Sequence, residues 1–113
     1  MDQHQVILNR RNQFDKELRE IQNNCLGYHN TYFGPIEGTR LKYDCVIYKM
    51  SAMDENKANN KTYVNRPVYD VTVISRNPET PVPWAIQNHF ERCSPGKFFV
   101  TENLYHFPFT IIY

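Results

Sequence analysis

Two cysteine–histidine pairs come closest, in residue type and spacing, to a metal site. Cys25 precedes His29 by four residues, and His89 precedes Cys93 by the same interval. Together the four side chains would form a Cys2His2 set of the kind that holds zinc tetrahedrally. The spacing is not specific, because Gly27 interrupts the first pair near a predicted helix end and buried cysteines also behave as small hydrophobic residues. We therefore predict no metal and no cofactor, and leave open whether the four side chains converge.

Acid–base chemistry has three candidate residues. Asp70 lies within an apolar segment, and Glu91 follows His89 by two positions. No nucleophile stands beside them, and the sequence has no glycine-rich phosphate loop, no Gly-x-Ser-x-Gly turn and no His-Glu-x-x-His motif. We predict that the chain is not an enzyme and has no catalytic residue. An unfamiliar active site around these three side chains stays open as an alternative.

Composition sets the class of protein. The 113 residues allow one modest core, so we predict a single domain, 1–113. With 13 basic and 12 acidic side chains, the net charge of +1 gives no field that would attract nucleic acid. No apolar run approaches the ~18 residues that cross a bilayer, and the first residues lack the pattern of a signal peptide. We expect a soluble intracellular domain with three reduced cysteines, no membrane partner and no specific nucleic-acid partner.

Aromatic residues are the informative excess. Eight tyrosines, seven phenylalanines and one tryptophan are more than one thin core comfortably hides. Aromatic side chains are enriched in protein interfaces, so the excess predicts a surface that a partner covers. A tyrosine-rich sheet whose hydroxyl groups face water explains the same composition, and both interpretations stay open.

An amphipathic helix is predicted at 1–23. The range contains neither glycine nor proline, and Ile7, Phe14, Leu18 and Ile21 recur at helical spacing. These four residues therefore share one stripe that can dock on the rest of the domain.

Strand and loop signals follow the helix. Residues 28–40 contain turn-forming glycine and proline, and are predicted to be a loop with a short extended piece at 32–33. Residues 43–50 are rich in β-formers with apolar side chains on both faces, which predicts a central strand. Residues 51–61 are mostly polar and lack aromatic and β-branched residues, so we predict a mobile surface loop there.

A long strand is predicted at 63–75. Pro67 interrupts it and has no N–H to donate, which places this proline at a sheet edge or a bulge. Apolar and polar residues alternate beyond it, so that one face of the strand is expected to be buried. A short helix begins near the next two prolines, and its Ile86 and Phe90 can pack on the sheet because they lie four residues apart.

Two strands at 98–101 and 107–113 are predicted to form a hairpin around 102–104. The predicted fold class is α+β: an antiparallel sheet of about four strands, with the N-terminal helix and the second short helix packed on one face. In the last strand the residues expected to share one side are Phe107, Phe109, Ile111 and Tyr113.

From about Tyr28 onward the chain resembles the tail terminator, or tail completion, proteins encoded in the head–tail gene clusters of tailed bacteriophages. Pro67 and Pro108 interrupt two segments that the resemblance needs to be extended. The segments that carry the resemblance are 66–78 (RPVYDVTVISRNP), 93–100 (CSPGKFFV), 102–106 (ENLYH) and 109–113 (FTIIY), with 32–39 (YFGPIEGT) and 43–48 (YDCVIY) upstream.

The resemblance implies a structural virion protein. Its copies form a ring, usually a hexamer, that caps the tail tube and joins the tail to the neck. The implied partners are further copies of the chain, the tail tube protein and the head–tail connector or stopper protein, while DNA passes through the ring. The implied location is the tail or neck of the virion, assembled in the host cytoplasm. A head-side neck adaptor or stopper, and a small nucleic-acid-binding or regulatory module, remain alternatives.

Subunit and partner contacts are predicted in two places. The loop at 51–61 is longer than the two to five residues that commonly join hairpin strands, so we interpret it as a functional arm. The ring contacts are also expected to use aromatic residues at the sheet edge and in the final hairpin. The predicted contact residues are Met53, Asp54, Glu55, Lys57, Lys61, Asn103 and Tyr105.

Overall fold

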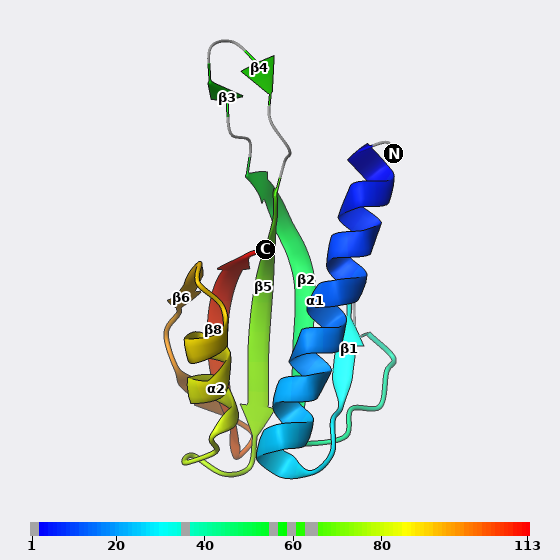
Figure 1. The fold of residues 1–113 in the computed structure, drawn as a ribbon. Helices are drawn as coiled ribbons and strands as arrows, with labels where there is room; N and C mark the ends of the chain where they lie inside the picture. Colours follow the sequence, from blue (N-terminus) through cyan, green and yellow to red (C-terminus); the bar gives the residue numbers. More distant parts are fainter. Residues whose placement is uncertain (1–2, 35–36, 55–56, 59–60, 63–65) are drawn as a thin grey trace.

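The computed structural model of the protein describes residues 3–34, 37–54, 57–58, 61–62 and 66–113. Two helices cover one face of a mixed six-stranded sheet (Figure 1), which confirms the predicted α+β class. The elements are α1 (Gln3–Leu26), β1 (Thr31–Phe33), β2 (Cys45–Asp54), β3 (Lys57–Ala58), β4 (Lys61–Thr62), β5 (Arg66–Ser75), α2 (Val82–His89), β6 (Cys93–Pro95), β7 (Phe99–Thr101) and β8 (Leu104–Ile112).

The main sheet has the order β1–β2–β5–β8–β6, and β7 also pairs with β8. β1 runs parallel to β2, whereas the other neighbouring pairs are antiparallel. The prediction of about four antiparallel strands is therefore wrong in the number of strands and in their direction. β1 was expected only as an extended piece of a loop, and β6 was missed. Each has three residues, too few for an alternating pattern to emerge.

α1 is longer than predicted but buries the expected stripe. Phe14, Leu18 and Ile21 belong to the core, while Ile7 is only partly buried. The helix stops at Gly27, whose φ of +81° is left-handed and whose N–H donates to the carbonyl of Asn23 at 2.9 Å. This is a common glycine ending of a helix. Neither helix in the described part of the chain is long and apolar enough to cross a bilayer.

The core lies between the sheet and the two helices, around Phe14. Its ring stacks on Tyr69 at a centroid distance of 4.6 Å and meets Tyr48 edge-on at 5.4 Å. Ile86 and Phe90 of α2 are buried in the same cluster, as their spacing predicts. One contiguous cluster therefore joins both helices to the sheet.

The prediction of a loop over 51–61 is wrong for much of that range. β2 continues to Asp54 beside the first residues of β5, and β3 pairs with β4. Pairing satisfies main-chain hydrogen bonds whatever the side chains are, so a polar segment can be extended when a partner strand lies beside it. A register shift between Met50 and Ala52 marks a bulge in β2. Residues 55–56 and 59–60, which include the predicted contact Glu55, lie outside the described residues.

Of the three prolines in the main sheet, Pro67 and Pro108 lie in strands that pair on both sides. β5 is a central strand and not an edge, and the carbonyl of Pro67, its second residue, accepts the N–H of Tyr113 at 3.2 Å. The missing N–H of Pro67 therefore lies on the side of Tyr113, whose carbonyl contacts Arg10 instead. In β8, Pro108 accepts a hydrogen bond from the N–H of Gly96 at 2.7 Å, so its main chain faces the gap between β6 and β7. The missing N–H of Pro108 therefore points at an interruption of the neighbouring strand and not at β5.

The predicted final hairpin is confirmed, although its second strand begins at Leu104 and not at residue 107. β7 and β8 are joined by Glu102 and Asn103, whose φ angles of 53° and 64° are both left-handed. Two such residues form the turn whose twist suits a two-residue hairpin loop. The side chains of the last strand that face the helices are the predicted ones, Phe107, Phe109, Ile111 and Tyr113.

Candidate subunit interface

The structure gives each member of the two cysteine–histidine pairs a separate place. His29 contacts the Asn23 side chain at 3.1 Å, and His89 pairs with Glu17 through Nε2 at 2.8 Å. Cys25 and Cys93 pack against the core. In the part of the chain that the structure describes, no group of three His, Cys, Asp or Glu side chains is arranged to hold a metal.

The acid–base candidates are not brought together either. Asp70 lies in the middle of β5 on the face without helices, across from Lys49 of β2 and Thr110 of β8. Glu91 and His89 line a cleft on the other side of the sheet, beside the ends of β5 and β8. The three residues therefore do not form one site.

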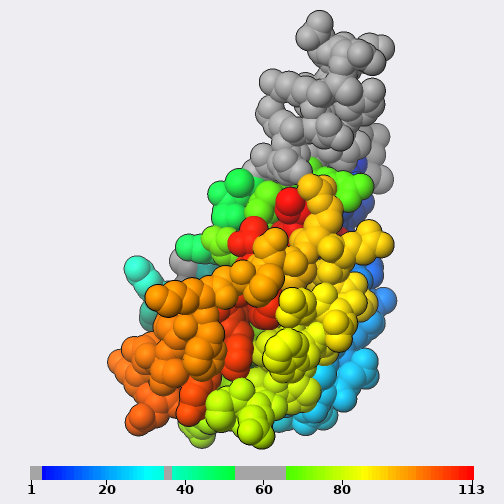
Figure 2. All heavy atoms as spheres, turned by 90° about the vertical axis from the view of Figure 1, so that its left-hand side faces the viewer, coloured from blue at the N-terminus to red at the C-terminus, as the bar shows by residue number. Residues whose placement is uncertain are grey.

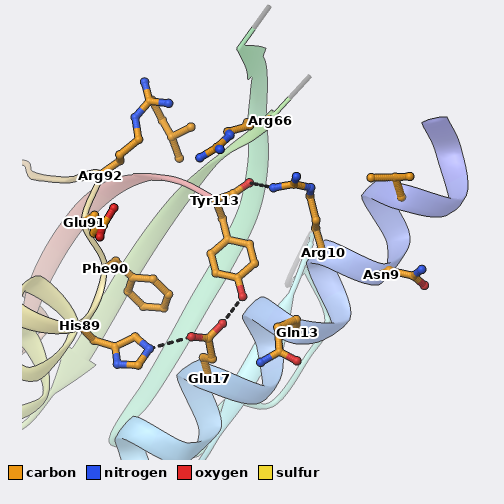
Figure 3. A pocket seen from close by; sticks show the side chains of 12 residues that line it. Asn9, Arg10, Gln13, Glu17, Arg66, His89, Phe90, Glu91, Arg92 and Tyr113 are labelled. Carbon is orange, nitrogen blue, oxygen red and sulfur yellow. Dashed lines mark hydrogen bonds and ion pairs between the residues drawn. The ribbon is translucent and has the colours of Figure 1, made fainter. Parts of the chain in front are cut away.

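That cleft lies between α1 and α2 and has a volume of about 580 Å³ (Figure 3). Arg10 crosses it to contact the Tyr113 carbonyl at 3.5 Å. Among the described residues that line it, none is a serine, threonine or cysteine that could act as a nucleophile. Its residues are Val6, Asn9, Arg10, Gln13, Glu17, Arg66, His89, Phe90, Glu91, Arg92, Ile112 and Tyr113.

Glu17 is the centre of the polar contacts in this cleft. Its carboxylate accepts hydrogen bonds from His89 and from the Tyr113 hydroxyl, as the dashed lines in Figure 3 show. Burial by itself would raise the pKa of Glu17, but the hydrogen bonds from Tyr113 and His89 outweigh it and hold that pKa below its usual value. Burial and the same carboxylate raise the pKa of Tyr113. These bonds connect α1 to α2 and to the end of the last strand, which indicates a structural role.

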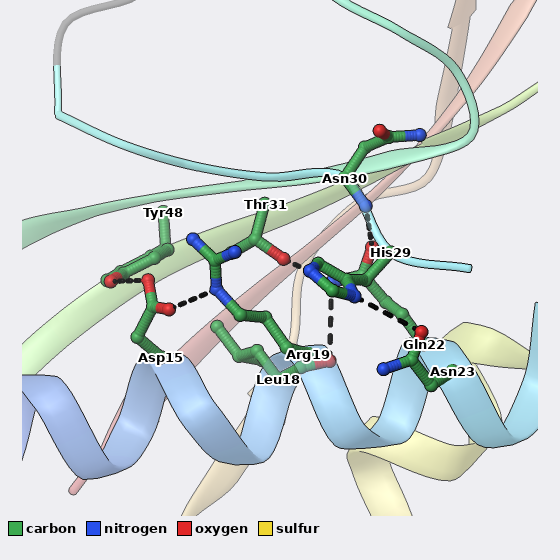
Figure 4. Close-up of polar contacts among 9 residues, drawn as sticks. All are labelled: Asp15, Leu18, Arg19, Gln22, Asn23, His29, Asn30, Thr31 and Tyr48. Carbon is green, nitrogen blue, oxygen red and sulfur yellow. Dashed lines mark hydrogen bonds and ion pairs between the residues drawn. The ribbon is translucent and has the colours of Figure 1, made fainter.

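A second polar network fastens α1 to β1 (Figure 4). The buried side chain of Gln22 donates to the Thr31 hydroxyl and to the Leu18 carbonyl, and accepts the N–H of Asn30 at 3.1 Å. All the polar groups of this amide thus have partners, which a buried amide requires. The network holds β1 against the helix and so positions one edge of the sheet.

The other edge carries an apolar groove of about 260 Å³ between α2 and the β6–β7 segment. Figure 2 shows this side of the molecule, with β8 visible in red between the yellow helix and the orange segment. Trp84 on the groove's rim is 68% exposed, and Phe98, which also lines the groove, is nearly half exposed. The groove is lined by Pro83, Trp84, Gln87, Pro95, Gly96, Phe98, Phe107, Pro108 and Phe109.

The groove exists because the edge strand is broken. A Cβ on Gly96 would lie 3.1 Å from the Pro108 side chain, so glycine allows the close approach at which β6 ends. The chain then leaves β8 and rejoins it at Phe99. Phe98, at the break, packs on Tyr105 and Phe107 instead of pairing with β8. The result is a hollow with an apolar lining beside an open strand.

The predicted contact residues fall at opposite ends of the sheet. Met53 and Asp54 lie opposite the first residues of β5, whereas Tyr105 lies opposite its last residue, Ser75. Asn103 is in the hairpin turn, and Tyr105 stacks on Phe98 and so borders the apolar groove. The structure places Lys57 in β3 and Lys61 in β4, and describes no side chain for them or for Met53 and Asp54.

Trp84, the most exposed large hydrophobic residue of the groove, was not among the predicted contact residues. An exposed tryptophan in a short helix is a signal in itself, because tryptophan is enriched among the residues that dominate binding energy. Phe98 and Phe99, two of the aromatic residues near the final hairpin where contacts were expected, are exposed, and their part in subunit contacts stays a prediction. No protein-family model matches the sequence, and no curated protein matches it.

Proposed function

We propose that the chain is a tail terminator, a structural subunit of the virion of a tailed bacteriophage. Six copies form a closed ring that caps the last ring of the tail tube. One face of the ring binds the tail tube protein, and the other receives the head–tail connector or stopper protein. Its action is geometric, because an occupied tube end cannot add further subunits.

The exposed apolar surface beside β7 is the observation that carries this proposal. Monomeric proteins seldom leave an uncharged edge strand next to an apolar groove open to water, since such an edge pairs with other chains. Trp84, Phe98 and Val100 are exposed at this edge. Assembly into a ring gives that surface a partner, and the resemblance of 66–113 to tail terminators supplies the type of ring.

A head-side neck adaptor or stopper is the second candidate, because it would form a ring and cover the same surface. A nucleic-acid-binding module is less favoured, since the net charge of +1 gives little attraction to phosphate. Binding to isolated tails or to isolated heads separates the first two candidates.

The substitution Trp84→Ser tests the proposal on assembled tails. Labelled protein is added to tails isolated from particles that lack this subunit, and the capped ends are counted by electron microscopy. Because the side chain is 68% exposed, the free energy of unfolding should change by less than about 0.5 kcal/mol. Interface tryptophans commonly contribute 2 kcal/mol or more, so the apparent affinity for tail ends should fall by about thirtyfold.

Asn88→Ser is the matched control, since Asn88 is exposed on α2 but does not line the groove. This variant should cap tails as the wild type does. A wild-type protein that never joins tails, at any concentration or ionic strength, would refute the tail terminator, and binding to heads would favour the neck protein. Normal capping by Trp84→Ser would remove the groove from the interface.

A further inference from the structure

Both edges of the main sheet end in short strands without charged residues. β7 is Phe-Val-Thr at one edge and β1 is Thr-Tyr-Phe at the other. Proteins usually protect such edges with charge, proline or a covering segment. The connection from β1 to β2 runs beside β1 in Figure 1, and the N–H of its Lys42 donates to the hydroxyl of Tyr32, but no described residue of the connection forms a main-chain hydrogen bond with β1.

The main chain of Val100 points away from the sheet. In a two-residue hairpin, the residues next to the turn form a hydrogen-bonded pair, here Thr101 with Leu104. The pairs then alternate, so Val100 opposite Tyr105 turns its N–H and carbonyl to the open edge. The Val100 side chain is 52% exposed.

β1 has the same pattern at the opposite edge. The carbonyl of Asn30 accepts the N–H of Val46, and the N–H of Gly34 donates to the carbonyl of Tyr48, each at 2.9 Å. Alternate residues of an extended chain point in opposite directions, so the main chains of Thr31 and Phe33 face outward. Among the described residues, none pairs with these outward groups.

Strand directions and side-chain faces of the two edges are compatible. β1 is parallel to β2, and each step from β2 through β5 and β8 to β7 reverses direction, so β7 runs opposite to β1. Through the strand registers Phe33 lies level with Phe109 of β8, whereas Val100 lies level with Tyr105, an offset of about 13 Å along the strands at about 3.3 Å per residue. Copies that are related by rotation about an axis inclined to the strands, as in a barrel, would take up this offset and bring β7 and β1 together antiparallel. Val100 and Phe33 project on the helix-covered face, as their register with β8 and β2 requires. Directly opposed residues of an antiparallel pair share a face, so the pairing keeps all helices on one side.

From this match we infer that β7 of one copy pairs with β1 of the next copy, so that the sheet continues from subunit to subunit. The contact joins two different edges of the same chain, and such a head-to-tail contact closes a ring when the rotation between neighbouring copies divides a full turn. This inference rests on the proposed ring and names the contact between its subunits. A different partner protein would not account for unpaired main-chain groups at both edges of the sheet, on strands that run in opposite directions.

Single cysteines give a direct test. Within one chain Phe33 and Val100 are about 23 Å apart, from four strand spacings of about 4.8 Å and an offset of about 13 Å along the strands. A disulfide needs Cα atoms within about 7 Å, so a bond between these positions can form only between copies. Phe33→Cys and Val100→Cys are each made in a chain whose half-buried Cys25 and Cys93 are replaced by alanine. The two variants are oxidised separately and as a mixture. Both experiments are done in solution, up to the solubility limit, and on isolated tails.

The inference predicts a covalent dimer from the mixture but not from either variant alone. A chain that carries both substitutions should give a ladder of covalent oligomers. Thr110→Cys, exposed on the opposite sheet face, replaces Val100→Cys in the control mixture and should give no dimer. Dimers of Val100→Cys alone would replace the inference with a symmetric β7–β7 contact.

Failure of the inference is distinguishable from failure of the proposed function. If the protein caps tails but forms no cross-link in solution or on the tail, the edge pairing is wrong and the proposal of a tail terminator is unaffected. A ladder formed by protein that never joins tails supports the pairing and refutes the terminator.

Val100→Pro supplies a second measurement. This change removes the outward N–H and no hydrogen bond of the hairpin, and proline is tolerated at such a position of an edge strand, so the hairpin should stay folded while assembly is lost. A variant that assembles normally would overturn the edge pairing.

Discussion

Two buried tyrosines of the core differ in whether their hydroxyl groups have partners. Tyr48 and Tyr69 are neighbours on adjacent strands, are both fully buried, and meet edge-on at 5.8 Å. The Tyr48 hydroxyl donates to Asp15, which also pairs with Arg19. The Tyr69 hydroxyl has no partner among the described residues. Replacing each tyrosine by phenylalanine should therefore change the free energy of unfolding in opposite directions.

The size of each change in the free energy of unfolding follows from the hydroxyl group that the substitution removes. Tyr48→Phe removes a hydrogen bond to a charged group, which commonly contributes about 1.5–3 kcal/mol. Asp15 keeps Arg19, so we expect the lower end, a loss of about 1.5 kcal/mol. Tyr69→Phe removes a buried hydroxyl whose lost hydration is not replaced, while the stacking on Phe14 at 4.6 Å is kept. Such an orphan group costs about 1–3 kcal/mol, so we expect a gain of about 1 kcal/mol.

Urea unfolding followed by far-ultraviolet circular dichroism measures both changes. The single tryptophan is a poor reporter, because Trp84 is largely exposed in the folded state. The melting temperature should fall by about 7 °C for Tyr48→Phe and rise by about 4 °C for Tyr69→Phe. An Asp15→Ala background is the control, since there the effect of Tyr48→Phe should largely vanish. A loss for Tyr69→Phe as large as that for Tyr48→Phe would refute the reasoning and point to a bound water as partner.

Three further outcomes are expected. Changing Glu102 and Asn103 to Asn and Gly should raise the free energy of unfolding by about 1 kcal/mol in urea titrations, because both positions have positive φ; an unchanged value would contradict the turn type. Burial, aided by the charge of Asp44, raises the pKa of Cys45 to about 12, so a thiol reagent at pH 8 should label Cys25 and leave Cys45 unmodified in the folded protein. The pKa of Glu17 in the folded protein is lowered from 4.5, so the stabilisation by this carboxylate is complete above pH 4.5 and is lost as the pH falls through its folded pKa. In Glu17→Gln, the free energy of unfolding should therefore fall less steeply with pH below 4.5, and an unchanged acid dependence would contradict this role.

Local patterns predicted the elements whose signals lie within one segment. Phe14 and Leu18 identified the buried stripe of α1, and Gly27 identified its end. The alternation after Pro67 identified the buried face of β5. These predictions held because helical and strand periodicity is set by which side chains of one segment meet the core.

Pairing between distant segments was not predictable in the same way. β1 joins the sheet as a parallel strand, although only an extended piece of a loop was predicted there. Cys93–Pro95 joins the sheet as an edge strand without a sequence pattern of a strand. Polar residues up to Asp54 are extended because β5 lies beside them. Main-chain hydrogen bonds decide these cases, and they depend on which segments are neighbours in space.

The candidate interface was also predictable only in part from the sequence. The sequence by itself determined that aromatic residues exceed the needs of a small core, and that a hairpin ends the chain around Glu102 and Asn103. Only the tertiary structure decided that Trp84 stays exposed beside a groove and that Val100 and Phe33 lie at opposite open edges. Whether an aromatic side chain is buried or exposed depends on the order of the strands and on where the edge strand breaks, and both are properties of the assembled sheet.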